Sequence, residues 1–186
     1  MTHQSVALVA HPGSGAAAPC RIEVAVALSR RGDLALDYRI AADTAGLRLS
    51  DGPVGRRADG LWHHTCCEAF IPRPGDAGYR EFNFAPSGAW AAYDFAGYRA
   101  GGIPAPVRAP VITCSRDTEA LRLHVTLLAA DLPVAPVLRL GLAAIVERTD
   151  GSLTHWALCH PADRPDFHHP HGFVLELDAP AARGRC

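Results

Sequence analysis

The chain has 186 residues, of which 48% are apolar and 20% are charged, and its formal net charge is −1. This balance is ordinary for a globular domain and gives no support for binding to nucleic acid or to an anionic membrane surface. All 18 basic residues are Arg, which excludes a lysine Schiff base and a P-loop lysine.

The apolar segments and the cysteines bear on where the protein resides and on whether it forms disulfides. The apolar run Val6–Ala10 is too short for a signal peptide, and no segment reaches the length of a membrane span. We therefore expect the protein to stay in the cytoplasm, where thiols remain reduced. The six Cys have no disulfide-framework or CxxC spacing, and we interpret them as buried free thiols.

The first half of the chain shows the period-2 alternation of β-strands. Two alternating runs, 22–28 and 34–40, flank a turn and predict a hairpin. Turn formers fill 43–60, which we expect to be a long loop. Further strands are predicted near 64–71, 79–84 and 89–95, followed by a Gly/Pro-rich connection over 100–110.

The second half continues the pattern. Residues 111–114 and 121–128 predict a hairpin, residues 129–132 predict one helical turn, and 138–147 and 153–158 should pair across an Asp-Gly turn. A loop over 159–171 precedes a last strand, 173–178. About ten short strands indicate an all-β fold, an antiparallel β-sandwich of jelly-roll or immunoglobulin-like type, with residues 1–186 as a single domain.

The stretch 61–99 is rich in aromatic residues interleaved with polar ones. If Phe84 pairs with Ala89, then Glu81, Asn83 and Trp90 share one sheet face, opposite the face of Phe82. Such a face could stack a sugar ring on Trp90 and bond its hydroxyls through Glu81, Asn83 and Arg99, with Trp62 and Trp156 as second-choice platforms. The alternative is that Trp90 is half-buried and Glu81 meets an Arg.

Three segments carry a family resemblance: LWHHTCCEAFI, YREFNFAPSGAWAAYDFAGYR and HWALCHPADRPDFHHPHGFVLEL. Over roughly 21–177 the chain resembles the DOMON-like bacterial proteins, which are grouped with the DOMON and family-nine carbohydrate-binding-module sandwiches. The resemblance implies a β-sandwich that binds a sugar or, in some relatives, a haem.

A metal ion and haem are the two candidate cofactors. The histidines of the loop before the last strand could ligate Zn²⁺, but their spacing matches no zinc signature. We therefore predict no metal site. The weak candidates for metal ligands are His160, His168, His169 and His171. Haem is the rival ligand. The only Met is Met1, so haem would need two His or a His and a Cys as axial ligands.

Catalysis is the remaining alternative. Ser87 lies in Pro-Ser-Gly rather than in a nucleophile elbow, whereas Glu68 and Glu81 could act as the acid and nucleophile of a glycosidase. We predict instead a non-catalytic, cofactor-free protein that binds a small carbohydrate or a glycosylated metabolite. Nucleic acid and membrane are not expected partners, and a protein partner stays an alternative.

Overall fold

The computed structural model describes residues 2–14, 20–49 and 54–180. Within them the chain forms antiparallel strands and five short 3₁₀ helices, with no α-helix. No helix of the described residues is long and apolar enough to cross a membrane. The strands are β1 (Thr2–Ala10), β2 (Arg21–Leu28), β3 (Leu34–Ala41), β4 (Cys66–Pro72), β5 (Tyr79–Phe84), β6 (Trp90–Gly97), β7 (Ala100–Pro104), β8 (Val111–Arg116), β9 (Ala120–Leu127), β10 (Val137–Glu147), β11 (Leu153–Ala157) and β12 (Leu175–Asp178). The 3₁₀ helices are η1 (Pro12–Ser14), η2 (Thr44–Gly46), η3 (Leu61–His63), η4 (Ala129–Asp131) and η5 (Pro170–Gly172).

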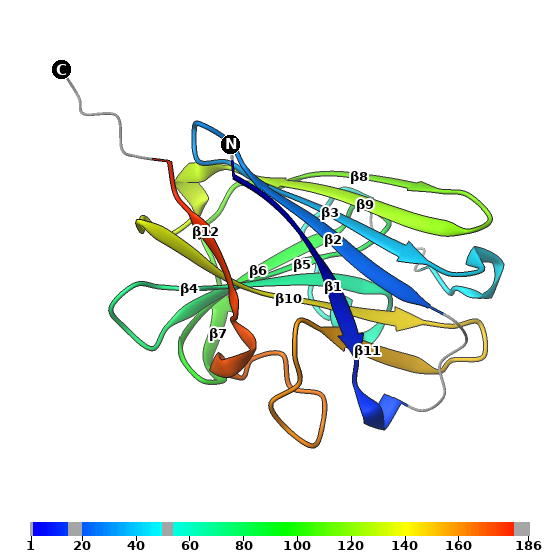
Figure 1. Ribbon diagram of the computed structural model, residues 1–186. Helices are drawn as coiled ribbons and strands as arrows, with labels where there is room; N and C mark the ends of the chain where they lie inside the picture. Colours follow the sequence, from blue (N-terminus) through cyan, green and yellow to red (C-terminus); the bar gives the residue numbers. More distant parts are fainter. Residues whose placement is uncertain (1, 15–19, 50–53, 181–186) are drawn as a thin grey trace.

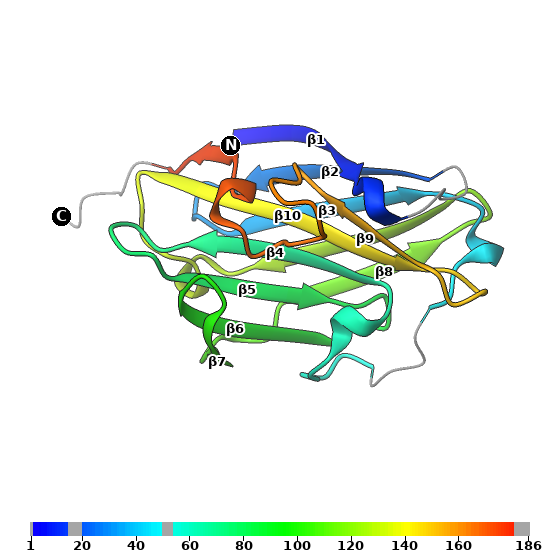
Figure 2. The same ribbon diagram turned by 90° about the horizontal axis from the view of Figure 1, so that it is seen from below.

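The strands form two packed layers that share one continuous hydrogen-bonded path (Figure 1). One layer has the order β7-β6-β5-β4-β10-β11 and the other the order β1-β2-β3-β9-β8. Strand β1 joins them, because it pairs with β2 over Thr2–Leu8 and with β11 through Val9 and Ala10. Strand β12 pairs with the first part of β10. We call the first layer the site layer. In Figure 2 this layer faces the viewer.

The main core lies between the layers and follows from the alternation of each strand. In β2 and β3 every second residue is buried, from Ile22 to Leu28 and from Leu34 to Ile40. The site layer contributes Phe82, Phe84 and the aliphatic residues beside them. The side chains of β4, β5 and β6 on the opposite, outer face of the site layer are also largely buried, because residues after β11 fold over them.

Most predicted elements are confirmed. The hairpins β2–β3, β8–β9 and β10–β11 have the predicted strands, and η4 supplies the predicted helical turn. Strands β1 and β7 were not predicted from the sequence. Only Leu8 of β1 is buried, so that strand shows no strong apolar alternation, and β7 is an exposed edge strand that contains Gly101 and Gly102.

The predicted register of the β5–β6 hairpin is wrong by one residue. Phe84 pairs with Trp90 rather than with Ala89, because Ala85 donates its N–H to the Ala89 carbonyl and shortens the loop to three residues. Gly88 has a φ of 81°, the left-handed conformation that such a loop requires. The slip moves Trp90 onto the face of Phe82, and it moves Tyr93 onto the face of Glu81.

Candidate functional site

A cavity of about 570 Å³ opens on the outer face of the site layer. We call it the site cavity. Its size lies within the range of small-molecule sites, and it combines aromatic walls with polar groups, as such sites usually do. Its aromatic lining is Trp62, Tyr93, Phe95 and Phe167, and its polar lining is His63, Glu68, Glu81, Arg99, His155 and His168.

Strand alternation places the two carboxyl groups of the cavity side by side. Glu68 of β4 pairs with Asn83 of β5, and Glu81 lies two residues from Asn83 on the same face. Glu68 and Glu81 are therefore diagonal neighbours across two strands, a spacing at which long side chains interact. Tyr93 of β6 lies directly opposite Glu81 and brings an aromatic ring to the same face.

The two carboxyl groups differ in their hydrogen bonding. Asn83 donates its Nδ2–H to Oε1 of Glu81 over 2.6 Å. The Glu68 carboxyl accepts no hydrogen bond from the described residues, although every fully enclosed polar side-chain atom among them has a partner. Since the Glu68 residue is only 3% exposed and lines the site cavity, its free oxygens open into that cavity.

Burial shifts the acidity of both groups. Removal from water raises the pKa of Glu68 well above its usual value, and the nearby charge of Glu81 raises it further. Burial also raises the pKa of Glu81, while the hydrogen bond from Asn83 and the charge of Arg99 oppose that rise. Paired buried carboxyl groups with raised pKa values in a cavity are typical of functional sites.

The segment between β11 and β12 crosses the outer face and forms one wall of the cavity (Figure 2). Tyr79 Oη lies 2.8 Å from Nδ1 of His168 and accepts the N–H of Arg99 over 3.2 Å. Nε2 of His168 then faces Oε2 of Glu81 at 3.8 Å. Burial, with a smaller contribution from the charge of Arg99, lowers the pKa of His168 to about 4, so this ring is neutral near pH 7.

Arg99 is held by its backbone and by an ion pair. It is the one non-glycine residue among the described residues with a positive φ, 52°, and it lies in the turn between β6 and β7. Its guanidinium lies 2.8 Å from Asp166, whose carboxylate also accepts the hydroxyl of Tyr98. A strained backbone that aims one charged side chain into a cavity is common at binding sites.

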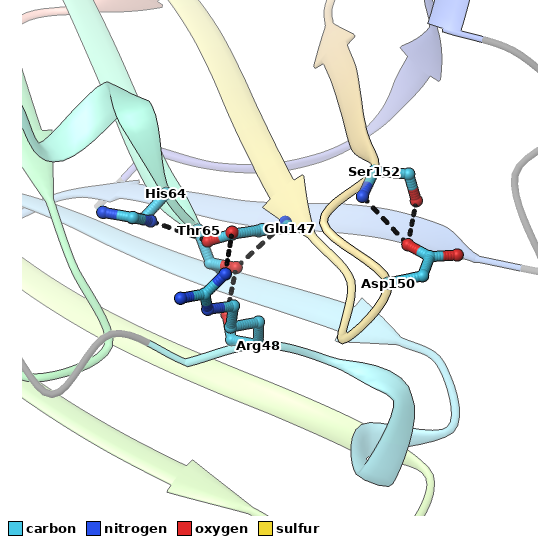
Figure 3. Close-up of polar contacts among 6 residues, drawn as sticks. All are labelled: Arg48, His64, Thr65, Glu147, Asp150 and Ser152. Atoms are coloured by element: carbon cyan, nitrogen blue, oxygen red, sulfur yellow. Dashed lines mark hydrogen bonds and ion pairs between the residues drawn. The ribbon is translucent and has the colours of Figure 1, made fainter.

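Trp62 and His63 reach the cavity from η3, which a polar cluster fixes to the end of β10 (Figure 3). Glu147 is 5% exposed, and its carboxylate lies 2.7 Å from Nδ1 of His64 and 3.2 Å from Arg48. Thr65 accepts the N–H of Glu147 and donates to the Arg48 carbonyl. Figure 3 also shows Asp150 capping the adjacent β10–β11 turn through Ser152. The Trp62 ring itself packs edge-on against Tyr93.

The structure brings three of the six predicted ligand-binding residues to the site cavity: Glu81, Arg99 and Trp62. Asn83 is fully buried and contacts Glu81 rather than the cavity. Trp90 is in the core between the layers, where Arg57 covers its ring, so its predicted position on the face of Glu81 is wrong. Trp156 also belongs to that core, and its indole N–H donates to Thr154.

The predicted metal candidates are dispersed. His168 lines the site cavity, whereas His160 bonds the Val9 carbonyl and packs against His11. His169 and His171 pack against each other. Among residues 2–14, 20–49 and 54–180, no three His, Cys, Asp or Glu side chains converge on a common point suited to a metal ion.

The interpretation of the cysteines as buried free thiols is correct for some and wrong for others. Cys66 and Cys67 are buried, on opposite faces of β4, and burial raises the pKa of both thiols. Cys20 and Cys159 are partly exposed, and Cys114 is exposed because β8 is an edge strand. Cys186 lies outside the described residues.

Several cavity residues were missed by the sequence analysis. Tyr93 lies opposite Glu81, whereas the register predicted from the sequence would have placed its ring on the core face with Phe82. Phe167 and His155 lie in or beside a loop whose path over the outer face has no signature in a single sequence. The concentration of His, Pro and Asp in that loop was the one available signal, and three residues of the loop line the cavity: Pro165, Phe167 and His168.

No protein-family model matches the sequence, and no curated protein matches it. The solved structures that share its architecture include two proteins described in terms of carbohydrate binding. A candidate carbohydrate-binding protein from Bacteroides uniformis superposes with a TM-score of 0.68 at 14% identity, covering 91% of this chain and 84% of its own. A family-nine carbohydrate-binding module from Caldicellulosiruptor kristjanssonii, in complex with cellotriose, superposes with a TM-score of 0.54 at 7% identity, covering 77% and 67%.

The chain has a CBM9/DOMON-like β-sandwich fold. The resemblance noted in the sequence is thereby confirmed for the fold. The all-β antiparallel sandwich is also confirmed, with twelve strands in the described part of the chain instead of about ten. At these identities the likeness concerns architecture. The chemistry of the site must therefore be argued from the residues of this chain.

Proposed function

We propose that this protein binds a small carbohydrate, or the sugar part of a glycosylated metabolite, in the site cavity. The observation that carries the proposal is the joint presence of Trp62, Tyr93 and Glu68 around one opening. Aromatic rings stack on the apolar faces of sugar rings, and an open buried carboxyl group exchanges hydrogen bonds with hydroxyls. The cellotriose complex of a structural neighbour supports the same ligand class.

Glycoside hydrolysis is the second candidate, because the cavity contains two neighbouring carboxyl groups. A retaining glycosidase needs one protonated acid and one carboxylate free to attack the sugar. Glu68 fits the acid, since burial keeps it protonated. Glu81 fits the nucleophile poorly, because Asn83 holds one of its oxygens and His168 faces the other. This difference favours binding without catalysis.

A glycan array followed by calorimetry tests the proposal. The purified chain should bind a subset of small glycans, and Trp62→Ala should weaken the tightest of them about tenfold or more, since it removes a stacking ring. Val111→Ala is the matched control, because that residue is exposed on the other layer. Chromatography of the incubated glycan should show no cleavage.

Two results would contradict the proposal. If no array glycan binds, or if Trp62→Ala binds as tightly as the unmodified chain, the site cavity is not a sugar site. Cleavage of the glycan that is lost in Glu68→Gln would instead establish hydrolysis.

A further inference from the structure

The carboxyl groups of the site cavity come from β4 and β5, and we call this part of its lining the cavity floor. Glu68 and Glu81 face each other diagonally, and both line the cavity. Arg99 is the one Arg in the lining, and it is paired with Asp166 at 2.8 Å. His168 lies on the side of Glu81 and is neutral near pH 7, as burial of its ring requires. The two carboxyl groups therefore share the charge of one cation, Arg99, which is itself paired with Asp166.

Glu68 is the open member of this pair. The residue is 3% exposed, and none of the hydrogen bonds among the described residues reaches its carboxyl oxygens. Since no fully enclosed polar side-chain atom of the described residues lacks a partner, these oxygens are open to water in the cavity, and a ligand that displaces this water must replace its hydrogen bonds. A neutral hydroxyl could do so with one hydrogen bond. An ammonium group could do so with a charge-assisted bond, which is about twice as strong as a neutral one.

We propose that the site cavity selects a sugar bearing a primary amine, whose ammonium group binds the Glu68 carboxylate beside Glu81. This inference rests on the proposed carbohydrate function and specifies its ligand. The ammonium would favour ionisation of Glu68 and would be attracted to both carboxyl groups. Trp62 and Tyr93 would hold the sugar ring above them, and the aromatic rings also favour a cation.

Binding of an amine should be coupled to loss of a proton. Burial and the charge of Glu81 keep the Glu68 carboxyl protonated in the empty cavity, while Arg99 favours its ionisation. His168, which also lines the cavity, has its pKa lowered to about 4 and is neutral at mildly acidic pH, and burial also lowers the pKa of His155. An arriving ammonium favours the carboxylate, so Glu68 releases its proton to the buffer, and no bond of the ligand breaks.

Calorimetry at mildly acidic pH, where a sugar amine is protonated, tests the proposal with four probes. Glucosamine should bind about tenfold or more tightly than glucose and N-acetylglucosamine, because it alone adds a charge-assisted hydrogen bond. Cyclohexylamine has the amine without the hydroxyls and should bind weakly. The enthalpy of glucosamine binding should change with the ionisation enthalpy of the buffer, whereas that of glucose should not.

Glu68→Gln keeps the shape of the side chain and removes its charge. It should abolish both the preference for glucosamine over glucose and the proton release. Glu119→Gln, an exposed residue beside the β8–β9 turn, is the control and should change neither. The proton-release measurement uses the unmodified chain and decides the question even if Glu68→Gln does not fold.

The outcomes separate the two proposals. Equal binding of glucosamine and glucose, or glucosamine binding without proton release, would overturn the amine preference and leave the carbohydrate site intact. Cyclohexylamine binding as tightly as glucosamine would show a general amine site and overturn the sugar component. Failure of glucosamine and of every neutral sugar to bind would overturn both.

Discussion

The contrast between Trp90 and Trp62 gives the sharpest mutational prediction. Both are tryptophans of the aromatic stretch, but Trp90 is 7% exposed in the core and Trp62 is 38% exposed at the cavity. Truncating a core Trp removes its buried contacts and leaves a void, which costs about 3–5 kcal/mol of stability. For a chain of this length, that loss lowers the melting temperature by about 6–20 °C.

Trp90→Ala should therefore be strongly destabilised, while its folded fraction binds sugar with nearly unchanged affinity. Trp62→Ala should lose only about 1 kcal/mol of stability, because its ring is partly exposed and has few partners. Its sugar affinity should fall by about 1–3 kcal/mol, the value of one stacking ring.

The assay is urea unfolding of both variants, followed by calorimetry well below their melting temperatures with the tightest sugar from the array. The opposite pattern would refute the reasoning. If Trp90→Ala folds as stably as the unmodified chain but no longer binds sugar, Trp90 faces the ligand, and the β5–β6 register described above is wrong.

Three further predictions follow from the same packing and charges. Gly141→Ala should cost about 1–3 kcal/mol of stability and weaken sugar binding, because the new Cβ would lie 2.5 Å from the Phe173 ring. Gly172→Ala is the control and should do neither, because its new Cβ would meet no atom within 4 Å. Equal urea midpoints for the two variants would contradict the prediction. The raised pKa of Glu68 means that the folded chain holds a proton which the unfolded chain loses above about pH 4.3, so the free energy of unfolding should fall as pH rises through that range. Glu68→Gln should flatten this fall in urea titrations, and parallel profiles would argue against a protonated Glu68. Finally, we expect the protein not to retain haem after reconstitution and gel filtration, because its single Met is Met1 and no CxxCH is present; a surviving Soret band would favour the haem alternative.

The strands of this fold were predictable where burial alternates. In β2, β3 and β9, every second residue packs in the core, so a period of two predicted these strands and the β2–β3 and β8–β9 hairpins, although not the pairing of β3 with β9. Strand β1 lacks that alternation because most of its residues remain partly exposed. Strand β7 is an edge strand with two glycines, and its pairing with β6 includes register shifts that no local pattern encodes.

The site was harder to predict than the fold because it depends on a register and on a long-range contact. Glu81 and Asn83 were placed on one face correctly, since they belong to the same strand. Their partners on β6 depended on whether the loop between β5 and β6 has three or four residues. The hydrogen bond from the Ala85 N–H to the Ala89 carbonyl decides for three. His168 reaches Tyr79 across 89 residues of sequence, a contact that local patterns do not specify.

Nuclear magnetic resonance of the three indole N–H groups tests the central claim, that sugar binds in the site cavity, most directly. The chain has three Trp, which give three separate indole signals in a protein labelled with ¹⁵N. On titration with the tightest sugar from the array, the signal of Trp62 should shift strongly, while those of Trp90 and Trp156 stay nearly constant because both rings lie in the core. A saturable shift confined to Trp90 or Trp156, with Trp62 unmoved, would contradict the account.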